Sequence, residues 1–193
     1  ATFTLVRYTL PDNEKMSAHM RYAIMRKTGI YDLTKDENIF VVQTTMNICI
    51  KNRFAENKHF DETMISAEDQ KYITTNLLDK MKIGYCREAS YNYYKHKGSA
   101  TSEKLYPQFA YEPEMKYYEW LFSLFEDGQI PKYIQALVFY NMIWKNNSNL
   151  LYPWHLEGEE YKKEYSRLIK LLNKIDTDVI VAHPTLNNFH KQY

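Results

Sequence analysis

A change in the spacing of apolar residues divides the sequence into two parts. Thr2–Leu10 alternates apolar and polar residues and is rich in β-forming residues, which predicts a strand. Apolar residues recur instead at helical spacing in three later segments, residues 116–126, 131–145 and 157–175. Residues 98–113, which contain two prolines and one glycine, predict a loop between the parts. We therefore expect a mixed α/β part over residues 1–105 and a helical segment over residues 106–193.

The α/β part contains further candidate elements. The polar segment at residues 14–27 predicts a helix, and residues 45–53 predict a short helix or a corner between a strand and a helix. A second helical pattern follows Ser66 and ends near Met81. Short apolar strands are expected at residues 38–43, 82–86 and 90–94.

The composition excludes several classes of function. The 193 residues carry 25 basic and 24 acidic side chains, so the net charge of +1 gives no general attraction to nucleic acid. Only 5 glycines occur and no glycine-rich phosphate motif is present. Cys49 and Cys86 stand inside apolar segments without CxxC spacing, which predicts buried thiols in a reducing compartment. No apolar run approaches the ~18 residues that span a membrane, and no signal peptide is visible.

An acidic pair, Glu68-Asp69, stands at the start of a predicted helix. Ser66 followed by an acid three residues later fits a capping box, in which the two side chains satisfy backbone amides of the first turn. That interpretation needs no chemistry. A carboxylate at a helix N-terminus is also held rigidly and kept ionised by the helix dipole, which suits a general base. The residues alone leave both interpretations open.

A basic and aromatic loop follows the predicted strands, with the sequence YYKHKGS at residues 93–99. It fits a solvated turn, or a loop that binds phosphate. In the second case Lys95 and Lys97 would neutralise a leaving pyrophosphate, and Ser99 would donate a hydrogen bond to it. His96 would be a metal or phosphate ligand, or a surface residue.

In this order the motifs resemble the second half of family 2 glycosyltransferases of the GT-A fold. The order is FDE, five residues, Glu68-Asp69, an apolar strand, and then the loop at residues 93–99. Upstream, TTMNICIKNRF at residues 44–54 is similar to the segment in which the family has Asn-Lys, apolar and aromatic residues and Arg-Arg. The resemblance covers residues 1–105 and implies the C-terminal part of a GT-A domain, a mixed sheet with helices.

The C-terminal part has a resemblance of its own. IPKYIQALVFYNMIWK at residues 130–145 and LIKLLNKIDTDVI at residues 168–180 look like a helical segment of bacterial capsule and teichoic-acid-type polymerases. In those proteins the segment follows the transferase domain and a further catalytic domain often comes next. The resemblance therefore implies that this chain, which begins with Ala1, is an internal piece of a longer protein.

The resemblance implies a role for each site residue. Asp69 would be the base that takes the proton from the acceptor hydroxyl as that oxygen attacks the anomeric carbon with inversion, and Glu68 would flank it. Asn47 would lie near the acceptor. The donor phosphates would meet the basic loop through Lys95, His96, Lys97 and Ser99.

The sequence departs from the family pattern at several positions. Lys95 replaces the commoner Arg and loses its bidentate recognition of phosphate. Ile48 replaces the family Lys, and Asn141 replaces an Asp of the helical motif. The DxD carboxylates that would hold the divalent metal, Mg or Mn, belong to a nucleotide-binding half that is not in this chain. Asp176-Thr177-Asp178 has those letters, but it lies in the wrong half and is interpreted as a turn or a helix cap.

The leading hypothesis is an inverting glycosyltransferase of bacterial surface polysaccharide synthesis. Its partners would be a nucleotide-sugar donor, a glycan acceptor and the missing N-terminal half, with no nucleic acid and no transmembrane segment. It would act in the cytoplasm, with peripheral association at the inner face of the membrane as a further expectation. The alternative is a non-catalytic helical interaction module. The chain alone is expected to have no transferase activity.

Overall fold

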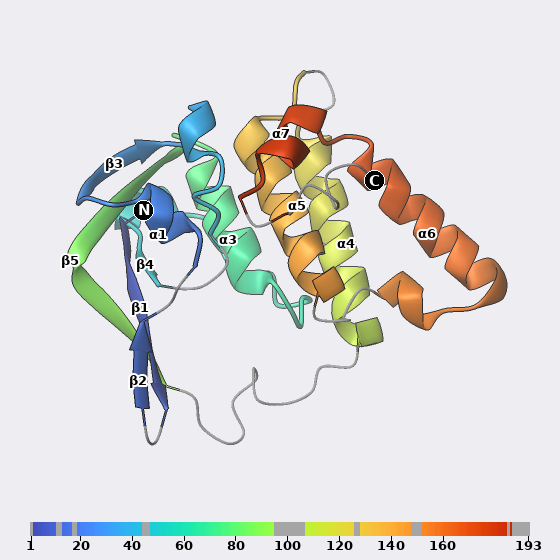
Figure 1. Ribbon diagram of the computed structural model, residues 1–193, viewed down its shortest axis with the longest axis horizontal. Helices are drawn as coiled ribbons and strands as arrows, with labels where there is room; N and C mark the ends of the chain where they lie inside the picture. Colours follow the sequence, from blue (N-terminus) through green and yellow to red (C-terminus); the bar gives the residue numbers. More distant parts are fainter. Residues whose placement is uncertain are drawn as a thin grey trace. The chain divides into compact units, whose positions relative to one another are not determined.

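The computed structural model describes residues 2–10, 13–16, 19–43, 47–94, 107–125, 128–147, 152–184 and 186. These residues form two compact units, Ala1–Leu105 and Tyr106–Tyr193. The first, here called the N-terminal unit, combines a small sheet with helices (Figure 1). The second, here called the helical unit, contains helices throughout the part that is described. The mixed α/β class expected from the sequence therefore holds for the first unit.

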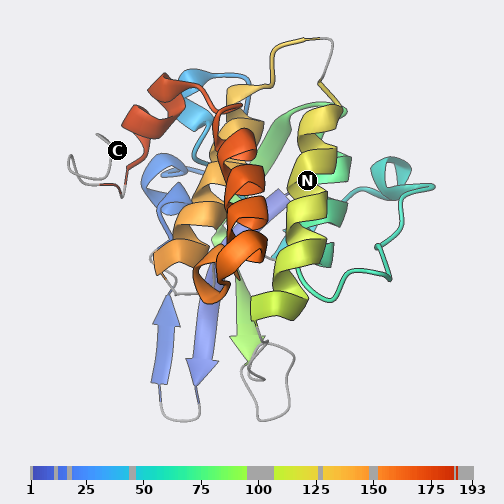
Figure 2. The same ribbon diagram turned by 90° about the vertical axis from the view of Figure 1, so that its right-hand side faces the viewer.

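The sheet of the N-terminal unit is built around two long strands, β1 and β5. β1 (Thr2–Leu10) pairs in parallel with β5 (Lys82–Tyr94), and β2 (Asn13–Met16) pairs antiparallel with β1. β3 (Gly29–Asp32) completes the order β2-β1-β5-β3, and the short β4 (Ile48–Cys49) also pairs with β1. Figure 2 shows the β1–β2 hairpin beside the end of β5.

The strand predicted at Thr2–Leu10 is confirmed, and the two strands predicted at residues 82–86 and 90–94 are the two halves of β5. The register of β5 against β1 shifts between the pairs Thr4–Cys86 and Leu5–Ser90. The shift skips residues 87–89 of β5. Polar residues there interrupt the apolar pattern, which is why the sequence predicted two strands. The Thr28 hydroxyl accepts a hydrogen bond there from the Arg87 amide at 3.0 Å.

Two predictions from local patterns are wrong. Within the segment 14–27, expected to be a helix, residues 14–16 belong to β2, and only α1 (Arg21–Ile24) is helical among the described residues. The strand expected at residues 38–43 is not formed: a 3₁₀ turn, η1 (Asp36–Asn38), leads into an irregular buried segment. A short apolar run indicates that a segment is buried, but it does not determine whether the backbone forms a strand.

The corner predicted at residues 45–53 is confirmed in its described part, where β4 leads into α2 (Asn52–Ala55). α3 (Glu68–Leu77) follows and lies beside the sheet (Figure 1). Its residues Ile73 and Leu77 are buried, as are Ile83 and Tyr85 of β5. Burying each such side chain contributes about 1.5–3 kcal/mol. α3 is therefore anchored by its apolar face, and its N-terminal turn has a defined place.

The sequence predicted that both cysteines are buried, and this prediction is wrong. Cys49 is exposed and Cys86 is partly exposed, and both are free thiols. Each stands in a strand, and alternate residues of a strand point to opposite faces of a sheet. Apolar neighbours in the sequence therefore did not place these side chains in the core.

The helical unit contains α4 (Pro107–Ser123), α5 (Lys132–Asn147), η2 (Tyr152–His155), α6 (Gly158–Leu172) and α7 (Thr177–Ala182). α4 and α5 run side by side (Figure 1). The loop predicted over residues 98–113 is wrong for residues 107–113, which belong to α4, while residues 98–106 lie outside the described part. Pro107 takes the first helical position, where its missing N–H leaves no bond unmade.

Polar contacts join the helices of this unit. The Lys145 ammonium of α5 lies 2.9 Å from the buried Glu114 carboxylate of α4. The Gln135 amide of α5 donates to the Asp176 carboxylate at 2.9 Å, and its oxygen accepts from the Asp176 backbone amide at 2.6 Å. Asp176 occupies the N-cap position of α7, although its side chain makes no capping hydrogen bond to the helix. Asp-Thr-Asp thus lies at a helix start, which agrees with its interpretation as a turn or a cap. None of the helices in the described residues combines the length and the apolar character of a membrane span.

Candidate functional site

The start of α3 carries the acidic pair singled out by the sequence. Ala67 is the N-cap residue, with a left-handed φ of 61°, and Glu68 and Asp69 form the first turn. No side chain at the N-cap bonds to the helix. The N-cap position is thus occupied by Ala67, one residue after the Ser66 that a capping box would place there. The backbone amides of a first turn have no partners within the helix, so contacts with other groups matter for its position.

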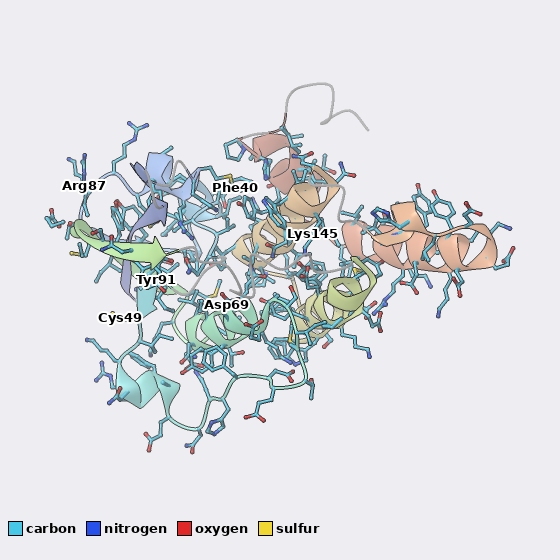
Figure 3. The ribbon with its side chains drawn as sticks, turned by 90° about the horizontal axis from the view of Figure 1, so that it is seen from below. Phe40, Cys49, Asp69, Arg87, Tyr91 and Lys145 are labelled. Atoms are coloured by element: carbon cyan, nitrogen blue, oxygen red, sulfur yellow. The ribbon has the colours of Figure 1, made fainter. Side chains whose placement is uncertain are left out.

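Asp69, which Figure 3 labels, is a partly buried carboxyl group with a raised pKa. Its Oδ1 atom accepts a hydrogen bond from the Gln70 backbone amide at 2.7 Å. The pKa of Asp69 is raised to about 6. Burial is the main cause and the charge of Glu68 adds to it, while the hydrogen bond from the Gln70 amide acts in the opposite direction. The expectation that the helix N-terminus simply keeps this group ionised is therefore incomplete, because desolvation outweighs the backbone hydrogen bond.

Residues 58–61, which precede α3, contact that helix and the turn that follows it. Lys58 forms an ion pair with Asp79 at 2.8 Å, and Asp61 forms one with Lys71 at 2.6 Å. The Phe60 ring stacks on Tyr72 with 4.3 Å between ring centroids. The hydrogen bond from Lys71 is the largest of the effects that lower the pKa of Asp61 to about 2. The FDE motif is thus a bracing element for α3.

A set of polar side chains, buried except for the half-buried Tyr22, lies behind the first turn of α3, and we call it the polar cluster. Its members come from four segments: Arg21, Tyr22, Gln43, Asn47 and Gln70. The Arg21 guanidinium donates to Oε1 of Gln43 at 2.7 Å, and the Gln43 amide donates to Oδ1 of Asn47 at 3.0 Å. The Gln70 side chain donates to the backbone oxygen of Gln43 at 3.2 Å. Gln43 is therefore the centre of the polar cluster.

His19 lies next to the polar cluster and is held neutral. Burial, followed by the charge of Arg21, lowers the pKa of His19 to about 3. Nδ1 of His19 accepts a hydrogen bond from the backbone amide of Arg21 at 3.2 Å. A neutral imidazole here leaves Arg21 as the cation of the polar cluster.

The structure brings together only some of the residues that the sequence singled out. Asp69 and Glu68 lie in the first turn of α3, and Asn47 is buried in the polar cluster behind it. Asn47 is bound on both sides, since its amide also donates to the Tyr22 hydroxyl at 3.5 Å. The remaining candidates lie outside the described residues: Lys95, His96, Lys97 and Ser99.

Sequence reasoning missed Arg21, Gln43 and Gln70. Gln43 is the polar residue that ends the apolar run at residues 39–42, and this was the one signal that pointed to it. Arg21 stands in a segment that looked like an ordinary polar helix, and Gln70 sits beside the acidic pair without a pattern of its own. Their hydrogen bonds join segments 22 and 27 residues apart, so no local pattern reports them.

Within the residues that the structure describes, no three His, Cys, Asp or Glu side chains are placed so that they could hold a metal ion. The site consists of one half-buried carboxyl group with an acidic neighbour, backed by buried amides and one guanidinium. Such a group can accept a proton near neutral pH, because its pKa of about 6 leaves it mostly ionised there.

Comparison with known proteins gives a distant similarity. No protein-family model matches the chain, and no solved structure matches it. The chain is 24% identical over 168 residues to the minor teichoic acid biosynthesis protein GgaB of Bacillus subtilis (strain 168). The similar region covers 84% of this chain and 19% of that protein, so the chain spans about a fifth of the length of its relative.

Proposed function

We propose that this chain supplies the acceptor side of an inverting glycosyltransferase, of the family 2 GT-A type, that uses a nucleotide sugar to build a cell-envelope polymer. The observation that carries the proposal is Asp69, a half-buried carboxyl group in the first turn of α3 with a pKa of about 6. The similarity to part of a teichoic acid biosynthesis protein supports the choice of polymer. The activity would take place in the cytoplasm, at the inner face of the membrane.

Asp69 would act as the general base. It takes the proton from an acceptor hydroxyl while that oxygen forms a bond to the anomeric carbon of the donor sugar. The bond from this carbon to the nucleoside diphosphate breaks, and the diphosphate leaves with the electron pair. A base with a pKa near 6 is suited to this step, because it is ionised at pH 7 and still binds the proton as it moves.

The other candidates take supporting roles in this proposal. Glu68 adds negative charge beside Asp69 and raises its pKa. Asn47 would act on the acceptor side indirectly, because its side chain is buried and bound to Gln43 and Tyr22. Lys95, His96, Lys97 and Ser99 would contact the donor phosphates, and a divalent metal, Mg or Mn, would be held by carboxylates outside this chain.

The test is Asp69→Asn in a protein that contains this chain and transfers sugar, with incorporation of labelled sugar into polymer as the measurement. Removing a general base slows transfer by roughly 10²–10⁴-fold, and the folding of the variant is checked by circular dichroism. Asp79→Asn is the matched control, since Asp79 is an exposed aspartate just beyond the other end of α3. Transfer by Asp69→Asn at the rate of the control would exclude Asp69 as the base and leave the alternative, a non-catalytic module.

A further inference from the structure

The first turn of α3 is held by a side chain of the helix itself. The N-cap residue, Ala67, offers no side-chain acceptor to the helix amides. Gln70 links this turn to its surroundings: its backbone amide donates to Asp69, and its side chain donates to the backbone oxygen of Gln43 at 3.2 Å. Gln70 is 4% exposed, so its side chain has little water to bond with in place of Gln43.

The acceptor for Gln70 is itself fixed by Arg21. Gln43 lies in the irregular segment at residues 39–43 that follows η1, where no helix or strand orders the backbone. The Arg21 guanidinium holds this segment at two points, the Gln43 side chain at 2.7 Å and the Val42 backbone oxygen at 3.2 Å. Arg21 and Gln43 are each 1% exposed. A guanidinium donates in a fixed planar geometry, so it determines where the Gln43 carbonyl lies.

We infer that Gln70 is a positioning residue for Asp69, and that Arg21 and Gln43 form the fixed support against which it acts. The catalytic meaning of this inference rests on the proposed function, but the positioning itself does not. Loss of the Gln70–Gln43 bond releases the first turn of α3 from the irregular segment. The Asp69 carboxyl group then gains contact with water, and its surroundings change although no atom of Asp69 has been altered.

The alternative is that these side chains only stabilise the fold. The two roles differ in what happens to the titration of Asp69. The charged group that affects the pKa of Asp69 is Glu68 on the same helix. The support on the other side of the Gln70–Gln43 bond carries Arg21, with His19 beside it. Gln70 carries no charge, so replacing it shifts the titration of Asp69 only by moving the carboxyl group or its solvent.

The experiment uses the 193-residue chain and follows the carbon-13 signal of the Asp69 carboxyl group by NMR between pH 3 and pH 8, assigned by its loss in Asp69→Asn. In Gln70→Leu we expect the pKa to fall from about 6 by one unit or more, a tenfold loss of proton affinity, because burial is the main cause of the raised value. Arg21→Lys should shift it in the same direction.

The matched control is Asn76→Leu, which removes another buried amide from α3. The Asn76 side chain donates to Tyr72 of the same helix at 2.9 Å and does not reach the first turn. The pKa of Asp69 should stay near 6 in this variant. Equal titration curves for Gln70→Leu and Asn76→Leu would overturn the inference. If Gln70→Leu does not fold, Gln70→Asn serves instead, because its shorter amide keeps the polarity but cannot reach Gln43.

The titration of Asp69 in these variants can be interpreted whether or not the proposed function is correct. A shifted titration in Gln70→Leu together with full transfer by Asp69→Asn would support the positioning role and reject the catalytic one. If Asp69 is the base, Gln70→Leu should lower kcat more than it changes KM and move the acid limb of the pH profile of transfer to lower pH. An unchanged pH profile beside a reduced rate would contradict positioning.

Discussion

Opposing effects act on the carboxyl group of Asp69. Removal from water disfavours its charge, while the hydrogen bond from the Gln70 amide favours it. Burial is the larger effect, so the folded protein holds a proton at Asp69 up to a pH of about 6. The unfolded chain releases that proton near 3.8, the ordinary pKa of an aspartate. The ionised form that a base requires is therefore a form that the fold disfavours.

This difference predicts that Asp69→Asn stabilises the protein at pH 8. The folded-state pKa is raised, so the wild-type free energy of unfolding falls as pH rises from about 4 to about 6 and is then constant with respect to this group. Two pKa units correspond to at most ~3 kcal/mol. We expect the variant to gain up to that amount at pH 8 and little at pH 4, measured by urea unfolding at both values.

Asp79→Asn again provides the comparison, since Asp79 is exposed and pairs with Lys58 at the surface. Its free energy of unfolding should not show the same gain at pH 8. A destabilised Asp69→Asn at pH 8 would mean that the ionised carboxylate has favourable partners that outweigh its burial.

The same pKa sets the pH dependence of the proposed reaction. Only ionised Asp69 accepts the proton, so the rate of transfer should rise as the pH passes through about 6 and level off above 7. Between pH 5 and pH 7 we expect about a tenfold increase in kcat/KM, measured from initial rates of nucleoside diphosphate release. A rate that is flat over this range would show that another group, or no group, takes the proton.

At the scale of elements, both units are fixed by polar contacts between segments far apart in the sequence. α3 is braced on its outside by Asp61 and Phe60 and on its inside by the polar cluster. α4 and α5 are joined by the pair Glu114–Lys145. Apolar faces bring the elements together, and the polar contacts select one relative placement among the many that hydrophobic burial alone would allow.

The pair Glu114–Lys145 gives a prediction for the helical unit. The Glu114 side chain is 7% exposed, and Lys145 supplies the ammonium 2.9 Å from it. Lys145→Met removes the charge that compensates a buried carboxylate, and such a change costs about 3–5 kcal/mol. The loss should be seen as a lower free energy of unfolding in urea at pH 7.

Two further variants test the cause of that loss. Lys162→Met removes an exposed lysine paired with Glu159, and it should change the free energy of unfolding by less than about 0.5 kcal/mol. Adding Glu114→Gln to Lys145→Met should restore a substantial part of the stability, because no buried charge then remains at that position. If the double variant is as unstable as Lys145→Met, the loss comes from packing of the lysine stem.

At the scale of the whole molecule, the proposed function gives this chain one side of a two-sided reaction. The base candidate lies in the N-terminal unit, and the described residues offer no group of ligands for a metal ion. The chain corresponds to about a fifth of its teichoic acid biosynthesis relative. In our proposal, the nucleotide-binding half and the metal belong to polypeptide outside this chain, while the loop at residues 95–99 contacts the donor phosphates.

We therefore expect no sugar transfer from the 193-residue chain alone. The measurement is release of nucleoside diphosphate from a panel of nucleotide sugars, with Mg²⁺ or Mn²⁺ present. A longer protein that contains both sides should show release that EDTA stops and that Mg²⁺ or Mn²⁺ restores. Turnover by the isolated chain would contradict the assignment of the metal to another part of the protein.

The sequence by itself determined the features that depend on neighbours along the chain. Alternation in Thr2–Leu10 determined β1, and helical spacing of apolar residues indicated α3, α5 and α6. It also placed the acidic pair at a helix start, because propensity and periodicity act over a few residues. The roles of Asp69, Glu68 and Asn47, and of the loop at residues 95–99, remain predictions.

Only the tertiary structure decided what surrounds those residues. The irregular path of residues 39–43, the single bulged β5 and the burial of Arg21 depend on segments that meet from distant parts of the chain. The same holds for the pKa of Asp69, which burial raises to about 6 although the sequence shows only an acid at a helix N-terminus. Desolvation depends on everything packed around a group, and that packing exists only in the folded molecule.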